Sequence, residues 1–103
     1  MIGDMFAKLH EAREKIEESK KKLDSVIVEA EVGNGAIKVK ASANKFIQNI
    51  EISAEFLKNN DRKELQELLV FGVNSALEEA AKKGEIEMKK ITKEMLPDFP
   101  GLI

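Results

Sequence analysis

The sequence predicts an α+β fold in which a three-stranded antiparallel meander, with strand order 1-2-3, lies between two long helices, giving an α-β-β-β-α chain. Apolar residues recur at steps of three and four through the first 23 residues, which is the period of a helix. The period then changes to two, and the chain reverses at Asn34-Gly35, a dipeptide typical of two-residue hairpin turns. A second long stretch of helical period follows Asp61 and completes the fold.

The first helix is predicted over residues 4–24. Nearly all of its remaining positions are Lys, Glu or Arg, so one apolar side faces a partner while the rest meets water. The apolar side is a heptad seam made of Ile2, Met5, Leu9, Ala12, Ile16, Ser19 and Leu23.

The first two strands are predicted over residues 26–32 and 36–43. A two-residue turn at Asn34-Gly35 sets a register in which apolar side chains share one face and opposite charges pair on the other. The predicted pairs are Val32 with Ile37, Ala30 with Val39, Glu31 with Lys38 and Glu29 with Lys40.

The third strand is predicted over residues 46–53, after a two-residue turn at Asn44-Lys45. Lys45 is the weak point, since such a turn needs positive φ there and a non-glycine residue is strained by roughly 1 kcal/mol. The predicted pairs are Ala43 with Phe46, Val39 with Ile50, Ile37 with Ile52 and Lys38 with Glu51.

The second helix is predicted over residues 61–95, with Asp61 as its cap and Pro97 disfavouring helix at Leu96. Its length is about 50 Å, whereas a seven-residue strand spans about 23 Å, so the helix overhangs the sheet. One alternative is that Gly84 ends this helix and a third short helix follows. Residues 96–103 form a tail.

The middle of the second helix is apolar on more than one side. One stripe suits the apolar face of the sheet and consists of Leu65, Leu68, Leu69, Gly72, Val73 and Ala76. Val70, Phe71 and Leu77 then point elsewhere and need a second covering surface. This surplus predicts a homodimer.

Composition limits the function classes. The 103 residues fit one domain, and the 43% hydrophobic and 35% charged content is typical of a globular chain without a membrane span. There is no cysteine, and the first 15 residues lack the pattern of a secretory signal, so we expect a cytoplasmic protein. The net charge of −2 gives no global attraction to nucleic acid.

Catalytic constellations are nearly absent from the sequence. His10 is the only histidine and lies among charged helix residues. The acidic residues of the first helix are better explained by a solvated face with Lys partners than by a metal site, and Gly33-Asn34-Gly35 is explained by the hairpin. We expect no enzyme activity, no cofactor, no metal and no small-molecule substrate.

Two basic clusters remain, at Lys20 to Lys22 and along the far half of the second helix. Such runs are usually solvated surface, and glutamates are interspersed here. The absence of tyrosine and tryptophan argues against a single-strand binder that stacks bases. Lysines on helical arms suit salt-sensitive contact with duplex phosphates.

Three segments of the chain resemble the YbaB/EbfC family of bacterial nucleoid-associated proteins. Two resemble it closely, LQELLVFGVNSALEEAAKK and the ending PGL at Pro100 to Leu102, and the third, GNGAIKVKASANKFIQNIEIS, does so less closely. The resemblance covers essentially the whole chain. Lys45 departs from it, because the family usually has glycine after the residue matching Asn44. The resemblance implies a tweezer-like homodimer that binds DNA through projecting helical arms, and hence a location at the nucleoid.

The resemblance selects which basic residues would contact DNA: Lys8, Arg13, Lys15, Lys20, Lys21, Lys22, Lys82, Lys83, Lys89, Lys90 and Lys93. The predicted dimer interface holds Val70, Phe71, Asn74 and Leu77. Asn74 contacts DNA or a partner, or, as we favour, is a buried amide that sets the dimer register.

Two functions stay open at this point. The first is a nucleoid-associated dimer that binds duplex DNA with weak sequence preference. The second is a dimeric interaction or scaffold module that grips another protein with the same arms and has little DNA binding. Net acidity favours the second and the family resemblance favours the first.

Overall fold

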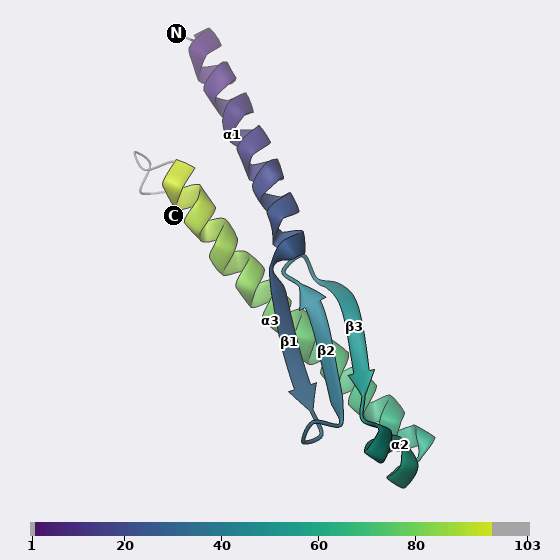
Figure 1. Cartoon of the computed structure of the whole chain (residues 1–103). Coiled ribbons are helices and arrows are strands. Elements are labelled where there is room, and N and C mark those ends of the chain that lie inside the picture. The colour runs from purple at the N-terminus through teal and green to yellow at the C-terminus, as the bar shows by residue number, and fades with distance from the viewer. Residues whose placement is uncertain (1, 96–103) are drawn as a thin grey trace.

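A three-stranded antiparallel sheet, covered on one face by a single long helix, forms the body of the protein (Figure 1). The computed structural model describes residues 2–95, so the predicted tail, 96–103, lies outside the described residues. The strand order is β1-β2-β3, which confirms the predicted α+β meander between two long helices. The elements in chain order are α1 (Ile2–Lys22), the 3-10 turn η1 (Leu23–Ser25), β1 (Ile27–Val32), β2 (Ile37–Ser42), β3 (Phe46–Ile52), α2 (Ala54–Asn59) and α3 (Arg62–Met95).

The hairpin between β1 and β2 has the predicted register, with Val32 opposite Ile37 and Glu31 opposite Lys38. Asn34 and Gly35 both have positive φ, 55° and 87°, as a type I′ turn requires. The turn is closed by the Ala36 N–H, which donates to the Gly33 carbonyl at 3.2 Å.

The hairpin between β2 and β3 differs from the prediction at its turn. Phe46 pairs with Ser42 instead of Ala43, so the turn has three residues rather than two. The Lys45 N–H donates to the Ser42 carbonyl at 2.9 Å, and Lys45 has φ 66°. A turn of this kind needs left-handed backbone at one residue only, whereas a type I′ turn needs it at two, one of which would be Asn44.

The longer turn changes which side chains of β3 face the core. Val39 still pairs with Ile50, because an extra residue in β3 shifts the register between Lys40 and Ala41. Between this bulge and the turn, the side chains of β3 that were predicted to face the core face away from it, and their neighbours face the core. Ile47 packs against the core, and Phe46 is 72% exposed instead of pointing inward as predicted.

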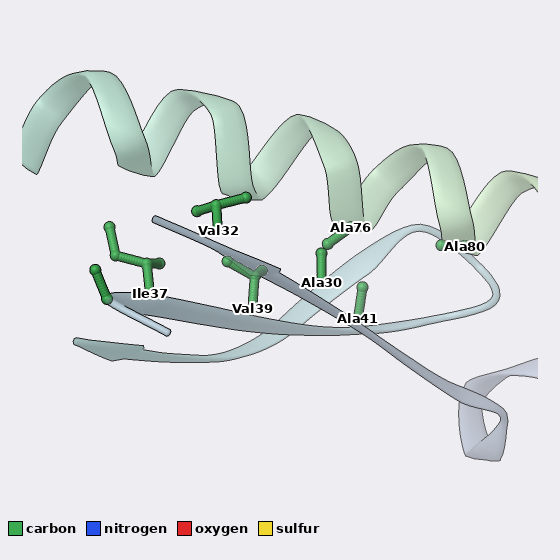
Figure 2. Close-up of a cluster of buried hydrophobic side chains, with 8 residues drawn as sticks. Ala30, Val32, Ile37, Val39, Ala41, Ala76 and Ala80 are labelled. Atoms are coloured by element: carbon green, nitrogen blue, oxygen red, sulfur yellow. The ribbon is translucent and has the colours of Figure 1, made fainter. Parts of the chain in front are cut away.

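The core lies between α3 and the inner face of the sheet. Ala76 and Ala80 point from α3 toward Ala30 and Ala41 of the strands, and these small side chains let helix and sheet approach closely (Figure 2). The predicted stripe of α3 is the one that covers the sheet, with Leu65, Leu68, Leu69 and Val73 packed around the core. The buried cluster is Ala30, Val32, Ala36, Ile37, Val39, Ala41, Ala76 and Ala80.

Helix α3 runs through Gly84 without a break, so the alternative of a helix end there is wrong. Asp61 is its cap, as predicted, because its Oδ1 accepts from the Glu64 N–H at 2.9 Å. Gly84 serves a close approach instead: a Cβ there would lie 2.7 Å from the carbonyl oxygen of Ala43. The glycine thus lets the helix contact the β2–β3 turn.

The short helix α2 was not predicted. Ser53 caps it by accepting the Phe56 N–H at 3.3 Å, and Phe56 packs against the core. Asn59 and Asn60 donate to the carbonyls of Glu55 and Phe56, each at 3.0 Å. Side-chain hydrogen bonds at both ends therefore stabilise a helix too short to be seen from periodicity.

The molecule is elongated because two helical arms extend from one end of the sheet (Figure 1). The N-terminal arm is α1, and the C-terminal arm is the part of α3 from residue 82 to 95. The principal extents are 69 × 21 × 17 Å. The radius of gyration is 19.5 Å, whereas a compact domain of this length has about 13 Å.

Candidate nucleic-acid interface

The N-terminal arm carries its apolar seam on one side and basic residues beside it. Ala12, Ile16 and Ser19 are half-buried and α1 contacts α3, so this part of the predicted seam faces the rest of the chain. Lys8, Lys15 and Lys22 follow at seven-residue steps, which places them in one row along the helix. All six predicted basic residues of α1 are exposed. Lys20, Lys21 and Lys22 also lie in the last turn, where they complement the helix dipole.

On the C-terminal arm, three of the lysines lie on a different flank from the apolar residues that face the end of α1, and the exposed Ile86 shares the flank of the lysines. Ala81, Gly84 and Met88 line a hollow together with Lys20 and Leu23, so this flank faces the end of α1. Lys82, Lys89 and Lys93 are exposed and recur at steps of seven and four, which places them on another flank. The structure therefore does not bring these lysines into the space beside α1. Their side of the arm is open to an external partner.

Six of the eleven predicted basic residues of the arms form ion pairs within their own helix; four of these pairs are exposed, and the two made by Glu87 are partly buried. Such pairs stabilise a helix by about 0–1 kcal/mol each and open readily when a phosphate competes for the lysine. The pairs, with N to O distances, are Lys15–Glu11 at 3.9 Å, Lys20–Glu17 at 3.7 Å, Lys82–Glu79 at 3.9 Å, Lys83–Glu87 at 3.4 Å, Lys89–Glu85 at 3.4 Å and Lys90–Glu87 at 3.8 Å.

A hollow of about 340 Å³ lies where the two arms leave the sheet. Lys45, which was not among the predicted binding residues, lines it together with Lys20 from α1 and Glu85 from α3. Sequence reasoning placed Lys45 on a turn, but only the packing of the turn against both arms brings it to their base.

The four predicted interface residues lie on the side of α3 away from the sheet or on its flank. Val70 and Phe71 are 63% and 62% exposed, Asn74 is exposed, and Leu77 is half-buried. The predicted burial of Asn74 concerns the dimer interface, so its exposure in the single chain does not test that prediction. Ile50 and Ile52, which pair with core residues of β2, are also 39% and 36% exposed.

Other site chemistry is limited to the surface. His10 Nε2 lies 3.0 Å from the Glu14 carboxylate, with both side chains largely exposed. Within residues 2–95, no three His, Cys, Asp or Glu side chains gather in a way that would hold a metal ion. None of the helices in that same range combines the length and hydrophobicity needed to cross a bilayer.

Comparison with known protein families shows which family the chain belongs to. The family model described as the YbaB/EbfC DNA-binding family matches residues 1–95. The chain belongs to this family. The match includes the sheet, α3 and both arms, so the resemblance seen in the sequence is confirmed.

Individual relatives agree with this assignment. A nucleoid-associated protein of Flavobacterium johnsoniae is 32% identical over 98 residues, covering 95% of this chain and 91% of that protein. A nucleoid-associated protein of Chlorobium phaeobacteroides is 32% identical over 95 residues, covering 92% of this chain and 84% of that protein.

The fold is also known from a solved structure. The crystal structure of an uncharacterized protein from Helicobacter pylori matches with a TM-score of 0.65 at 18% identity, covering 93% of this chain and 97% of that one. At this identity the likeness concerns the YbaB-like fold alone.

Proposed function

We propose that this chain is a single-domain nucleoid-associated protein that binds duplex DNA, as a homodimer and with weak sequence preference, through the lysine-bearing flanks of its two arms. The observation that carries the proposal is the exposed row of Lys82, Lys89 and Lys93 on a helix that projects past its sheet, in a member of a DNA-binding family. The names of the relatives support a location at the nucleoid, in the cytoplasm.

The shape of the C-terminal arm suits the phosphate backbone. Lys82 to Lys93 covers about 16 Å of helix, and a duplex carries one negative charge per about 1.7 Å of its axis. Lysine contacts phosphate as a flexible point charge, and phosphate contacts carry no sequence information, so binding of this kind would have a weak sequence preference. We also propose that the protein is not an enzyme, since its only histidine is a surface residue paired with Glu14.

The homodimer is supported by the apolar surface that one chain leaves uncovered. The chain exposes 7837 Å², against about 5,800 Å² for a compact monomer of its mass. Part of this excess comes from the arms, but Val70 and Phe71 lie in the first third of α3, between Leu69 and Val73, which pack against the core. We propose that the partner chain covers them together with Asn74 and Leu77.

The first test is a mobility-shift titration on random duplex DNA at two salt concentrations. We expect the logarithm of the affinity to fall linearly with the logarithm of salt, with a slope of several units, because each phosphate contact releases a counterion. An affinity that ignores salt contradicts the proposal.

A charge-reversal variant locates the binding surface. Replacing Lys82, Lys83, Lys89 and Lys90 by Glu should abolish binding without changing the mass of the protein in solution. The matched control reverses four exposed charges outside the arms, at Lys40, Lys58, Arg62 and Lys63, for the same change in net charge. If both variants lose binding equally, the arms are not the site.

The alternative function, a dimeric module that grips another protein, is favoured by one observation. Six lysines of the arms already have carboxylate partners, and the net charge is −2, so the arms present mixed charge rather than a basic surface. A dimer that fails to shift DNA at low salt would support this function over DNA binding.

A further inference from the structure

The turn between β2 and β3 is fastened to the end of the N-terminal arm. The side-chain Nδ2 of Asn44 donates to the carbonyl of Lys20, in the last turn of α1, at 2.8 Å, and to Oδ1 of Asp24 at 2.6 Å. An amide nitrogen is suited to this place because it carries two hydrogens for two acceptors. Asn44 thus satisfies one of the carbonyls that a helix end leaves without an intrahelical partner.

Further contacts hold the same junction. The Ala43 N–H donates to the Val26 carbonyl at 2.8 Å, which ties the turn to the residue before β1. Gln48 Nε2 donates to the Asp24 carbonyl at 3.4 Å, a longer bond. Leu23, between α1 and this junction, is only 5% exposed. The direction in which α1 leaves the sheet is therefore set at the turn.

The opposite side of the same turn contacts the C-terminal arm. The carbonyl oxygen of Ala43 lies so close to Gly84 that a Cβ on this residue would be 2.7 Å away. Backbone meets backbone here, with no flexible side chain between to absorb a displacement. One three-residue turn, Ala43 to Lys45, thus contacts both arms at their base.

We propose that the β2–β3 turn is the spacer that sets the separation of the two arms, and that Asn44 is its positioning residue. The N-terminal arm is about 31 Å long, so a rotation of about 10° at its base moves its far end by about 5 Å. The spacer therefore sets the distance that a partner must span in order to contact both arms at once. Only the identity of that partner as DNA rests on the proposed function.

The absence of cysteine permits a direct test. Cysteines placed at Glu11 and Ile86, both exposed, take spin labels whose separation is measured by double electron–electron resonance, without DNA. Labelled chains are diluted with excess unlabelled chains so that each molecule reports one pair. Glu11 lies about 16 Å along α1 from its base, so the same rotation moves it by about 3 Å. The Asn44→Ala and Asn44→Asp variants should therefore shift the mean separation by about 3 Å or broaden its distribution, and Asn44→Asp in addition places a carboxylate against two acceptors.

The controls are Asn59→Ala and Asn59→Asp, which remove a similar side-chain bond, Asn59 to the Glu55 carbonyl at 3.0 Å, in α2. Gly84→Ala tests the spacer from the other arm and should also shift the separation, whether or not Asn44→Asp folds. Folded Asn44→Ala and Gly84→Ala proteins with unchanged separation would overturn the proposal. So would an equal shift in the Asn59 controls.

The outcome for DNA is read separately. We expect Asn44→Ala to weaken duplex binding about 3- to 10-fold, a loss of about 0.7–1.4 kcal/mol, with each lysine intact. If the separation shifts and the unsubstituted protein binds no DNA, the spacer stands and the proposed function fails. If the unsubstituted protein binds DNA with salt dependence but the separation of the arms stays unchanged in the variants, the proposed function stands and the spacer proposal fails.

Discussion

At the residue scale, backbone conformation at a few positions determines the local geometry. Lys45 has φ 66°, a left-handed conformation that costs a non-glycine residue roughly 1–2 kcal/mol, whereas the comparable turn residue Gly35, at φ 87°, carries no Cβ. The strain is tolerated because the Lys45 N–H closes the turn and Asn44 beside it binds α1. The sequence correctly identified Lys45 as strained, although it misjudged the turn that strains it.

Replacing Lys45 by glycine should therefore stabilise the protein. Glycine adopts positive φ without a Cβ clash, and we expect the free energy of unfolding to rise by about 1 kcal/mol, less the extra entropy of glycine in the unfolded chain. Urea denaturation at fixed protein concentration measures the change. Lys45→Ala is the control, because it removes the charge and keeps the strain; equal stabilisation by both variants would mean that backbone strain is not the cause.

At the element scale, the single helix α3 covers the sheet with one side, exposes an apolar surface on the other side, and ends as the C-terminal arm. Its 34 residues need a defined start, which the Asp61 cap provides, and a close approach to the sheet, which Gly72 permits. A methyl group at Gly72 would lie 3.2 Å from side chains of both Val32 and Val39. One helix thus packs on the body and still overhangs it, since its length exceeds that of any strand.

The cap of α3 can be tested by removing its acceptor. Asp61→Ala leaves the Glu64 N–H without its partner and should lower the free energy of unfolding by about 1 kcal/mol. Asp61→Asn keeps an oxygen acceptor at the same place and should lower it much less. Thermal and urea unfolding of the three proteins decide the matter, and an Ala variant as stable as the original would show that the cap is replaced by water.

At the scale of the whole molecule, the two projecting arms account for both the elongated shape and the apolar surface that stays exposed. The core is small, and Ile37, Val39 and Ser42 are the largest fully buried residues among those described. A chain of 103 residues that projects two arms keeps few residues for its interior, so the outer side of α3 stays apolar and exposed. A partner chain on that side would complete the interior.

The Phe71→Asp variant tests that arrangement. In the proposed interface this charge would be buried without a partner, so the proposed dimer should dissociate or the protein should unfold, because folding and assembly would be coupled. Mass in solution by light scattering, with circular dichroism for folding, gives the result. Phe46→Asp is the matched control, since Phe46 is more exposed, at 72%, and lies outside the predicted interface. A Phe71→Asp protein that stays a folded dimer would contradict the proposed interface.

Prediction from the sequence succeeded where short-range signals decide structure. Asn34-Gly35 and the alternation of Glu31 with its neighbours were sufficient for the first hairpin, and the stripe through Leu69 and Ala76 identified the buried face of α3. The prediction was wrong where two local solutions compete. For Phe46, a two-residue turn and a three-residue turn with a bulge both align the rest of the strand, and the sequence pattern cannot choose between them.

The sequence by itself determined the order of helices and strands, the register of most of the sheet, and the placement of lysines on two long helices, because periodicity and turn chemistry act over a few residues. Only the tertiary structure decided that the lysine flank of α3 is turned away from the end of α1, and that the turn at Asn44 meets both arms. Those relations join residues far apart in the sequence, from 24 positions between Asn44 and Lys20 to 61 positions between Leu23 and Gly84, and they follow from how the elements pack rather than from any local pattern.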